Sequence, residues 1–126
     1  LYSDAAMPSQ LQKTAQDVLA ALNAGATLSQ EDLYQLDLNG LDLQNANLSR
    51  AILIRANLSR TNLSCADLSA ADLRGADLTQ AVLRQANLQG TCLYRVDLSG
   101  ADLREANLSD AKLQGARYDS QTQFPE

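Results

Sequence analysis

The sequence predicts an all-β solenoid whose backbone turns a corner every five residues. Seventeen leucines lie five residues apart, from Leu33 to Leu113. A helix buries positions three and four apart, and a long strand alternates its faces every two residues, so a period of five fits neither. A corner in every unit removes this conflict, because each leucine can then point inward.

Each unit has a regular composition around its leucine. An alanine usually lies two residues before the leucine, Asp or Asn lies directly before it, and Ser or Thr often follows it. Ala and Leu, two apart, both point inward as in a short strand, and the acidic position between them points outward. The last position, called here the corner position, holds five of the six glycines, which suits the dihedral angles of a turn.

Units such as ADLRG, ANLSR, ADLTQ, ANLQG and ADLSG resemble the pentapeptide-repeat family, which is common in cyanobacteria. The resemblance covers roughly Glu31 to Ala116. It implies a right-handed quadrilateral β-helix with four pentapeptides per coil, so that residues twenty apart stack on one face. Many members of this family have no assigned biochemical role.

Different segments are predicted at the two ends of the repeat. Residues 1–30 form an N-terminal segment with an amphipathic capping helix at about 8–24, which begins near Pro8 and Ser9 and stops at Gly25. The β-helix is predicted over 31–118. The tail, 119–126, together with Tyr118, is expected to cover the last leucine layer through Tyr118, Phe124 and Pro125, or to pair end to end with a second copy. Caps are expected because an open ladder edge invites aggregation.

Composition excludes several classes of function. The net charge of −5 argues against nucleic-acid binding, and there is no histidine to act as a base or metal ligand. No apolar run is long enough to span a membrane. Because there is no histidine, the serines lack an activating base and Cys65 and Cys92 lack a histidine partner. The two cysteines are also not spaced as the ligands of a metal site are. We expect no enzyme activity, no cofactor and no metal.

The two cysteines bear on the compartment. Cys65 and Cys92 fall on different faces by coil arithmetic, so a disulfide between them is not expected. A reducing compartment is favoured, and we predict the cytoplasm. The periplasm or the thylakoid lumen is the alternative if a signal segment was removed.

One face is predicted to be more apolar than the other three. This candidate interaction face comprises Tyr34, Ile52, Ile54, Arg74, Cys92 and Tyr94. Its composition has a plain structural interpretation, because β-branched and aromatic residues favour strand ladders. It is also typical of a contact patch for a partner. Under the second interpretation Ile54→Asp or Tyr94→Asp abolishes partner binding with the fold intact, since both side chains should point outward.

Two charged features are further candidates. Arg50, Arg55 and Arg60 occupy three consecutive corner positions and form a candidate basic corner patch, which either balances nearby aspartates or binds an acidic partner. Aspartates stack with Asn57 along another face, at Asp37, Asp77 and Asp97. Such ladders are similar to the ordered negative charges of family members that bind type II topoisomerases, for which DNA mimicry has been proposed.

These observations predict a non-catalytic module that binds another protein or acts as a scaffold, as a monomer or weak dimer, with an unknown partner and no nucleic-acid or membrane ligand. The first alternative is a DNA-mimic inhibitor or protector of a type II topoisomerase. The second is a purely structural rod.

Overall fold

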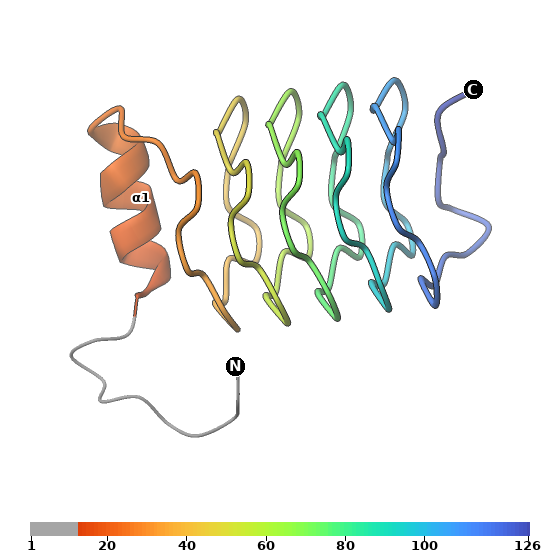
Figure 1. Ribbon diagram of the computed structural model, residues 1–126, viewed down its shortest axis with the longest axis horizontal. Coiled ribbons are helices and arrows are strands. Elements are labelled where there is room, and N and C mark those ends of the chain that lie inside the picture. The colour runs from red at the N-terminus through yellow and green to blue at the C-terminus, as the bar shows by residue number, and fades with distance from the viewer. Residues whose placement is uncertain (1–12) are drawn as a thin grey trace.

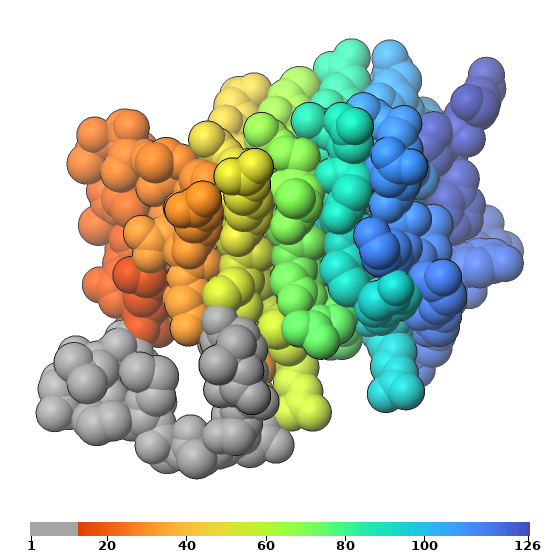
Figure 2. Space-filling view, viewed as in Figure 1, coloured from red at the N-terminus to blue at the C-terminus, as the bar shows by residue number. Residues whose placement is uncertain are grey.

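The computed structural model describes residues 13–126. One helix, α1 (Ala15–Asn23), lies at one end of a stack of coils that leads away from it to the C-terminus (Figure 1). The coils contain isolated parallel bridges rather than long strands. Figure 2 shows the successive coils as bands that run side by side across the surface.

The bridges give the register of the stack. Asp32 pairs with Ile52, Ile52 with Asp72, and Asp72 with Cys92, each time twenty residues further along the chain. Four five-residue units therefore complete one coil, as the resemblance to the pentapeptide-repeat family implies. Each unit donates and accepts backbone hydrogen bonds with the coil before and the coil after, for example Leu53 N to Asp72 O at 2.8 Å and Ile52 N to Glu31 O at 2.9 Å.

The leucines fill the interior of the stack. Every leucine of the five-residue series from Leu33 to Leu103 is at most 1% exposed, and the alanine positions from Ala46 to Ala101 are also buried. Thr61 and Thr91 occupy the alanine position in two units and are fully buried. Their hydroxyls donate to the carbonyls of Leu58 at 2.7 Å and Leu68 at 2.8 Å, so they add no unpaired polar group to the core.

Every corner has the same backbone geometry. The residue after each corner donates its N–H to the preceding leucine carbonyl, as Ala56 does to Leu53 at 3.0 Å. All eighteen corner positions from Gln30 to Gly115 have positive φ, and only five of them are glycine. One positive φ at the third turn residue is the pattern of a type II turn. The positive φ therefore belongs to the corner position itself, and residues other than glycine adopt it there as well.

The acidic position stabilises the same corner. In all thirteen units with Asp or Asn there, the side-chain oxygen accepts the backbone N–H two residues later, for example Asn62 Oδ1 from Ser64 at 3.1 Å and Asp77 Oδ1 from Thr79 at 2.9 Å. This is an Asx turn, a side-chain imitation of a backbone turn. The preference for Asp and Asn therefore has a structural cause.

Helix α1 has defined signals at both ends. Thr14 is the N-cap, and it forms a capping box with Asp17. At the other end Gly25, with φ +75°, donates to Leu22 O and Ala26 donates to Ala21 O, the two bonds of a Schellman motif. The helix begins at Ala15, and the predicted start near Pro8 and Ser9 lies outside the described residues. Val18 is 1% exposed and belongs to the same buried cluster as the leucines.

The ladder extends beyond both predicted boundaries, 31 and 118. Leu28 is buried and donates to Asn47 O at 3.0 Å, so the repeat includes one earlier unit. At the other end Gln123 bridges to Asp102, a step of twenty-one residues that accommodates one extra residue in the last coil. Tyr118 and Phe124 stack edge to face with ring centroids 5.4 Å apart.

The tail covers the last leucine layer incompletely. Leu113 remains 37% exposed, Phe124 39% and Tyr118 66%. The prediction that these aromatic residues cover the last layer is therefore wrong for Leu113. The reason is that Tyr118 and Phe124 occupy leucine positions of the final coil themselves, so they extend the layer instead of closing it.

Candidate binding groove

A shallow groove of about 850 Å³ runs along one face of the stack. Five successive coils contribute to it, and it contains four of the six residues of the predicted interaction face: Tyr34, Ile54, Arg74 and Tyr94. The other lining residues are Arg55, Gly75, Arg95, Gln114 and Gly115. We call this surface the tyrosine groove. Ile52 and Cys92, the remaining two predicted residues, are half-buried on the same face but do not line it.

Two parallel ladders build the groove. The first, at the position after the leucine, consists of Tyr34, Ile54, Arg74, Tyr94 and Gln114. In the second, at the corner positions, arginine alternates with glycine. A Cβ atom at Gly75 would lie 3.6 Å from Arg55 Cγ, and one at Gly115 would lie 3.2 Å from Arg95 Cγ. Each arginine stem therefore lies against the glycine of the next coil, and the missing side chains help to make the surface hollow.

Ile54 forms part of the groove but is only 9% exposed. It lies outside the main leucine cluster. The expectation that Ile54 is exposed is therefore wrong. We expect Ile54→Asp to destabilise the fold, because the substitution would place a charge in a site with little access to water. Tyr94 is half-buried and keeps the accessibility that the prediction requires.

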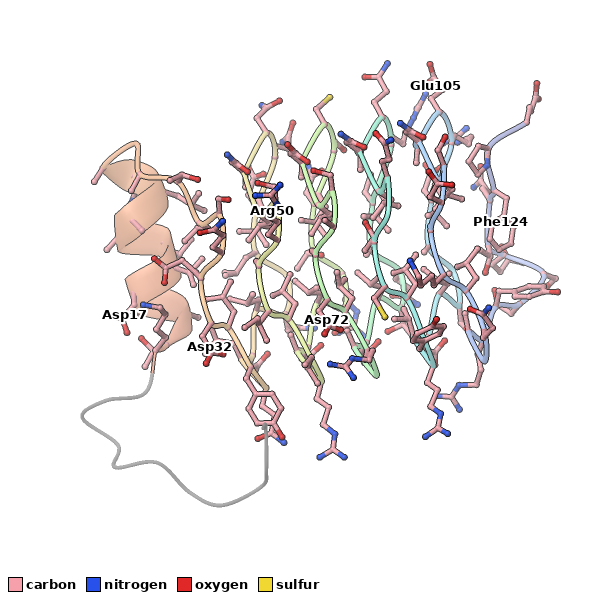
Figure 3. The ribbon with its side chains drawn as sticks, viewed as in Figure 1. Asp17, Asp32, Arg50, Asp72, Glu105 and Phe124 are labelled. Atoms are coloured by element: carbon pink, nitrogen blue, oxygen red, sulfur yellow. The ribbon has the colours of Figure 1, made fainter. Side chains whose placement is uncertain are left out.

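The groove carries an excess of positive charge. Arg74 donates to both carboxylate oxygens of Asp72, with Nη2 to Oδ2 at 2.7 Å and Nε to Oδ1 at 2.9 Å, and these hydrogen bonds raise the pKa of Arg74 above its ordinary value. Arg95 is exposed and has no ion pair among residues 13–126. In Figure 3 the labelled Asp72 lies with Asp32 toward one edge of the stack, away from Arg50 and Glu105.

The charges on the face that carries the groove do not cancel. This face has four cations (Arg55, Arg74, Arg95 and Lys112) and three anions (Glu31, Asp32 and Asp72), so its balance is 4 − 3 = +1 on a chain whose net charge is −5. The face therefore differs in sign from the protein as a whole.

The candidate basic corner patch is not a single surface. Arg50, Arg55 and Arg60 are all exposed, and each has a φ of 58°. They occupy three successive corners of the coil, however, and so face three directions. Only Arg55 lines the tyrosine groove, and Arg60 Nε donates to Gln80 Oε1 at 3.3 Å.

The acidic ladders are engaged within the protein. Asp37, Asp77 and Asp97 stack through Asn57 as predicted, and each accepts a backbone N–H. Asp97 also lies 3.3 Å from Arg117 Nη2. The pKa of Asp97 is lowered, chiefly by the hydrogen bonds from the backbone and side chain of Ser99. These carboxylates therefore stabilise the corners of the coils, besides giving this face its negative charge.

Among residues 13–126 there is no group of three or more His, Cys, Asp or Glu side chains that could hold a metal ion. Cys65 and Cys92 are free thiols. Within the same part of the chain no helix is long and apolar enough to cross a membrane.

The sequence pattern of the predicted interaction face did not include Arg95, Gly75 and Gly115. A signal for the two glycines and Arg95 was present, because Arg55, Gly75, Arg95 and Gly115 lie twenty residues apart at corner positions and alternate in size. Corner residues that follow one another around a coil, such as Arg50, Arg55 and Arg60, face different directions. Corner residues twenty apart in the sequence lie on the same face.

The family model described as pentapeptide repeats (8 copies) matches residues 24–53, 32–64, 61–100 and 81–117. The chain belongs to the pentapeptide-repeat family. A pentapeptide repeat protein from the thylakoid lumen of Arabidopsis thaliana is 31% identical, with a TM-score of 0.68, over 71% of this chain and 62% of its own. Another, from Nostoc PCC 7120, is 37% identical with a TM-score of 0.54 over 91% of this chain and 88% of its own.

A more distant match is QnrB1, a plasmid-mediated fluoroquinolone resistance protein, at 19% identity and a TM-score of 0.40 over 75% of this chain and 80% of that one. Similarity of this degree carries no argument about function. The comparison with curated proteins found no match. Membership in the pentapeptide-repeat family implies a right-handed quadrilateral β-helix, and proteins of this family are generally non-enzymatic structural or interaction modules.

Proposed function

We propose that this pentapeptide-repeat protein is a non-catalytic binding module that holds another protein in the tyrosine groove. The observation that carries the proposal is the groove itself, which gathers two tyrosines, a buried isoleucine and the exposed Arg95 on one face. Tyrosine and arginine are enriched among the residues that dominate binding energy at protein interfaces.

The backbone under the groove supports the same proposal. Every coil beneath it is bonded to the next, as in Gly75 N to Tyr94 O at 2.9 Å and Arg95 N to Gln114 O at 3.1 Å. The groove residues therefore start from nearly fixed positions. Binding then loses little backbone entropy, which is one of the main costs of association.

Capture of a partner from a lysate of the source organism tests the proposal, with wild type compared against Tyr94→Ala and Tyr118→Ala. Tyr118 is the matched control, because it is an exposed tyrosine outside the groove. We expect Tyr94→Ala to lose the partner and Tyr118→Ala to keep it, while both retain the circular dichroism of wild type. Equal capture by the two variants would contradict the proposal.

The geometry gives less support to DNA mimicry. The stacked aspartates stabilise corners, and Asp72, Asp97 and Asp102 each pair with an arginine. Inhibition of DNA supercoiling by wild type that survives Tyr94→Ala would favour mimicry over the groove. A purely structural rod predicts neither partner capture nor inhibition.

The proposal also includes a compartment and an oligomeric state. We retain the cytoplasm as the predicted compartment, with the thylakoid lumen as the alternative supported by the similar protein from Arabidopsis thaliana. We also retain a monomer or weak dimer, which light scattering over a range of concentrations measures directly.

A further inference from the structure

We infer that the edge of the last coil at residues 111–115 binds the free carboxyl end of a partner polypeptide as an added parallel strand. The last residue of that partner follows a large apolar residue, which in turn follows an acidic one. We call this edge the terminal edge; it lies at the end of the stack opposite α1 (Figure 1). The inference goes beyond the proposed function, because it concerns the end of the stack and not the tyrosine groove.

The bonds between the last two coils show what a strand needs in order to pair at this place. Lys112 N donates to Thr91 O at 3.0 Å, and Lys112 O accepts from Leu93 N at 2.8 Å. Two residues later, Gln114 O accepts from Arg95 N at 3.1 Å. Two alternate residues of the later coil therefore make all three bonds. The first uses both its N–H and its C=O, and the second uses only its C=O.

The three equivalent groups of the last coil are Ala111 O, Leu113 N and Gly115 N, and none of them makes a hydrogen bond among residues 13–126. The tail pairs on another side of the coil, where Gln123 N donates to Ala101 O at 2.9 Å. An edge with unpaired N–H and C=O groups is a template for one more strand. The terminal edge therefore offers two donors and one acceptor in the spacing that a parallel strand requires.

Charge selects the direction of the added strand. A Cβ atom at Gly115 would lie 3.2 Å from Arg95 Cγ, so the stem of Arg95 leans on the last coil at that corner. Arg95 is exposed and makes no ion pair within the part of the chain that the structure describes. Asp110, at the other end of the terminal edge, is exposed and equally free of ion pairs there. A carboxylate is therefore attracted to the Gly115 corner and repelled from the Asp110 corner.

The register places the last residue of the partner at this corner. In a parallel strand the second alternate residue presents its C=O to Gly115 N, as Gln114 does to Arg95 N in the coil before. If that residue ends the chain, the accepting oxygen belongs to a carboxylate, whose negative charge then lies beside Arg95. A chain that continued would have to turn a corner, which Gly115 does with a φ of +75°, or leave the stack. A chain that ends there does neither.

The other two residues of the partner are set by the side chains of the terminal edge. The middle residue points inward, as Leu113 does between Lys112 and Gln114. Leu113 is 37% exposed, whereas Leu93 in the coil before it is 0% exposed, so a large apolar residue at this place would cover the open layer. The first residue points outward beside Lys112, which is exposed and makes no ion pair among residues 13–126. An acidic side chain suits that place.

Fluorescence anisotropy with short peptides labelled at the amino end tests the inference, using the full 126-residue chain. The first peptide ends in Asp-Leu-Ser with a free carboxyl group. The second is its C-terminal amide, the third has serine in place of the leucine, and the fourth has asparagine in place of the aspartate. We expect saturable binding of the first peptide. The amide and the serine peptide should bind about tenfold more weakly, and the asparagine peptide about threefold more weakly.

The protein variants locate the site. Arg95→Gln should raise the dissociation constant of the first peptide about tenfold and leave that of the amide nearly unchanged. Arg50→Gln is the matched control, because Arg50 is also an exposed corner arginine, with φ 58° against 59°, but lies in an earlier coil. It changes the net charge equally and should alter binding less than about twofold. Lys112→Gln should abolish the preference for aspartate over asparagine, because the two side chains act as a pair.

Each other outcome has a definite meaning. Equal binding of the first peptide and its amide would overturn the role of the terminal carboxylate, and equal weakening by Arg95→Gln and Arg50→Gln would overturn its location. A dimer in light scattering that the first peptide does not dissociate would mean that a second copy occupies the terminal edge, and it would overturn the inference as well. Absence of binding by the first peptide would also overturn it. The proposed function would still stand in that case, because partner capture with Tyr94→Ala tests the groove separately.

Discussion

Aspartate and asparagine are interchangeable in this repeat because the corner uses only what they share, a side-chain oxygen of the same reach. Both accept the N–H two residues later, as Asn62 does from Ser64 at 3.1 Å and Asp67 does from Ser69 at 3.0 Å. Where the chain has Ile52, Val82 or Cys92 instead, that N–H has no such acceptor. The negative charge of the protein is therefore partly a by-product of how its corners are closed.

Asn62→Ala tests this explanation at one corner. The substitution removes the acceptor for Ser64 N and also for Ser64 Oγ at 2.7 Å. We expect the free energy of unfolding, measured with urea, to fall by about 1–2 kcal/mol. Asn62→Asp keeps the acceptor and should change it by less than about 0.5 kcal/mol. If both variants lose the same stability, the charge-independent role of this position is wrong.

At the scale of the element, α1 places apolar side chains on the N-terminal end of the stack. Val18 is buried, and Ala15, Ala21 and Leu22 pack against the same cluster. The nine-residue helix is too short to be stable alone in water, so its order depends on this contact and on its two caps. We interpret it as the cap that the first coil requires.

Val18→Asp tests the capping role, with Ala20→Asp on the exposed side of α1 as the control. A charge at position 18 would be buried without a partner, which costs about 3–5 kcal/mol. We expect loss of amide protection first in α1 and the coil that begins at Leu28, detected by hydrogen exchange, and self-association by light scattering. Ala20→Asp should cost about 0.7 kcal/mol, the difference in helix propensity. Unchanged protection in Val18→Asp would show that the helix is not needed there.

Some elements of the fold could be predicted from the sequence better than others. The buried series from Leu33 to Leu103 could be predicted because one five-residue rule places every side chain in or out. The burial of Ile54 could not, since the same rule places this position on the outside and Ile54 does not belong to the leucine cluster. Gln123 was missed because the last coil departs from the consensus with a step of twenty-one residues. Leu28 lies in register, five residues before Leu33, and its unit departs from the consensus only in having Thr27 at the Asp/Asn position. The groove was predicted in part, and Arg95 was not included because the corner positions were grouped around one coil and not along the stack.

At the scale of the whole molecule, stability is distributed along one line of contacts. Each coil bonds only to the coil before and the coil after, as in other solenoids, so total stability is close to a sum over coils and their interfaces. A substitution that disrupts a central coil breaks its contacts with two neighbouring coils. A substitution in the last coil breaks contacts with only one neighbour, and that coil is already partly exposed.

Leu73→Asp and Leu113→Asp test this distribution with the same substitution at the same position of a unit. Leu73 is 0% exposed in a central coil, and Leu113 is 37% exposed in the last. We expect Leu73→Asp to lower the free energy of unfolding by about 5 kcal/mol or more and Leu113→Asp by about 1–2 kcal/mol. Thermal denaturation followed by circular dichroism measures both. Equal losses would mean that the last coil is as fully integrated as the central one.

The twenty-residue register also limits how such a chain can change its length. Inserting one five-residue unit between Ile54 and Tyr94 would move every later residue by a quarter of a coil. Tyr94 and Arg95 would then lie on a different face from Tyr34 and Ile54. Duplicating a complete coil would instead lengthen the stack and keep each face continuous. Genetic changes in steps of twenty residues can therefore preserve a binding surface that spans several coils, while a change of five divides it between two faces even though the core remains regular.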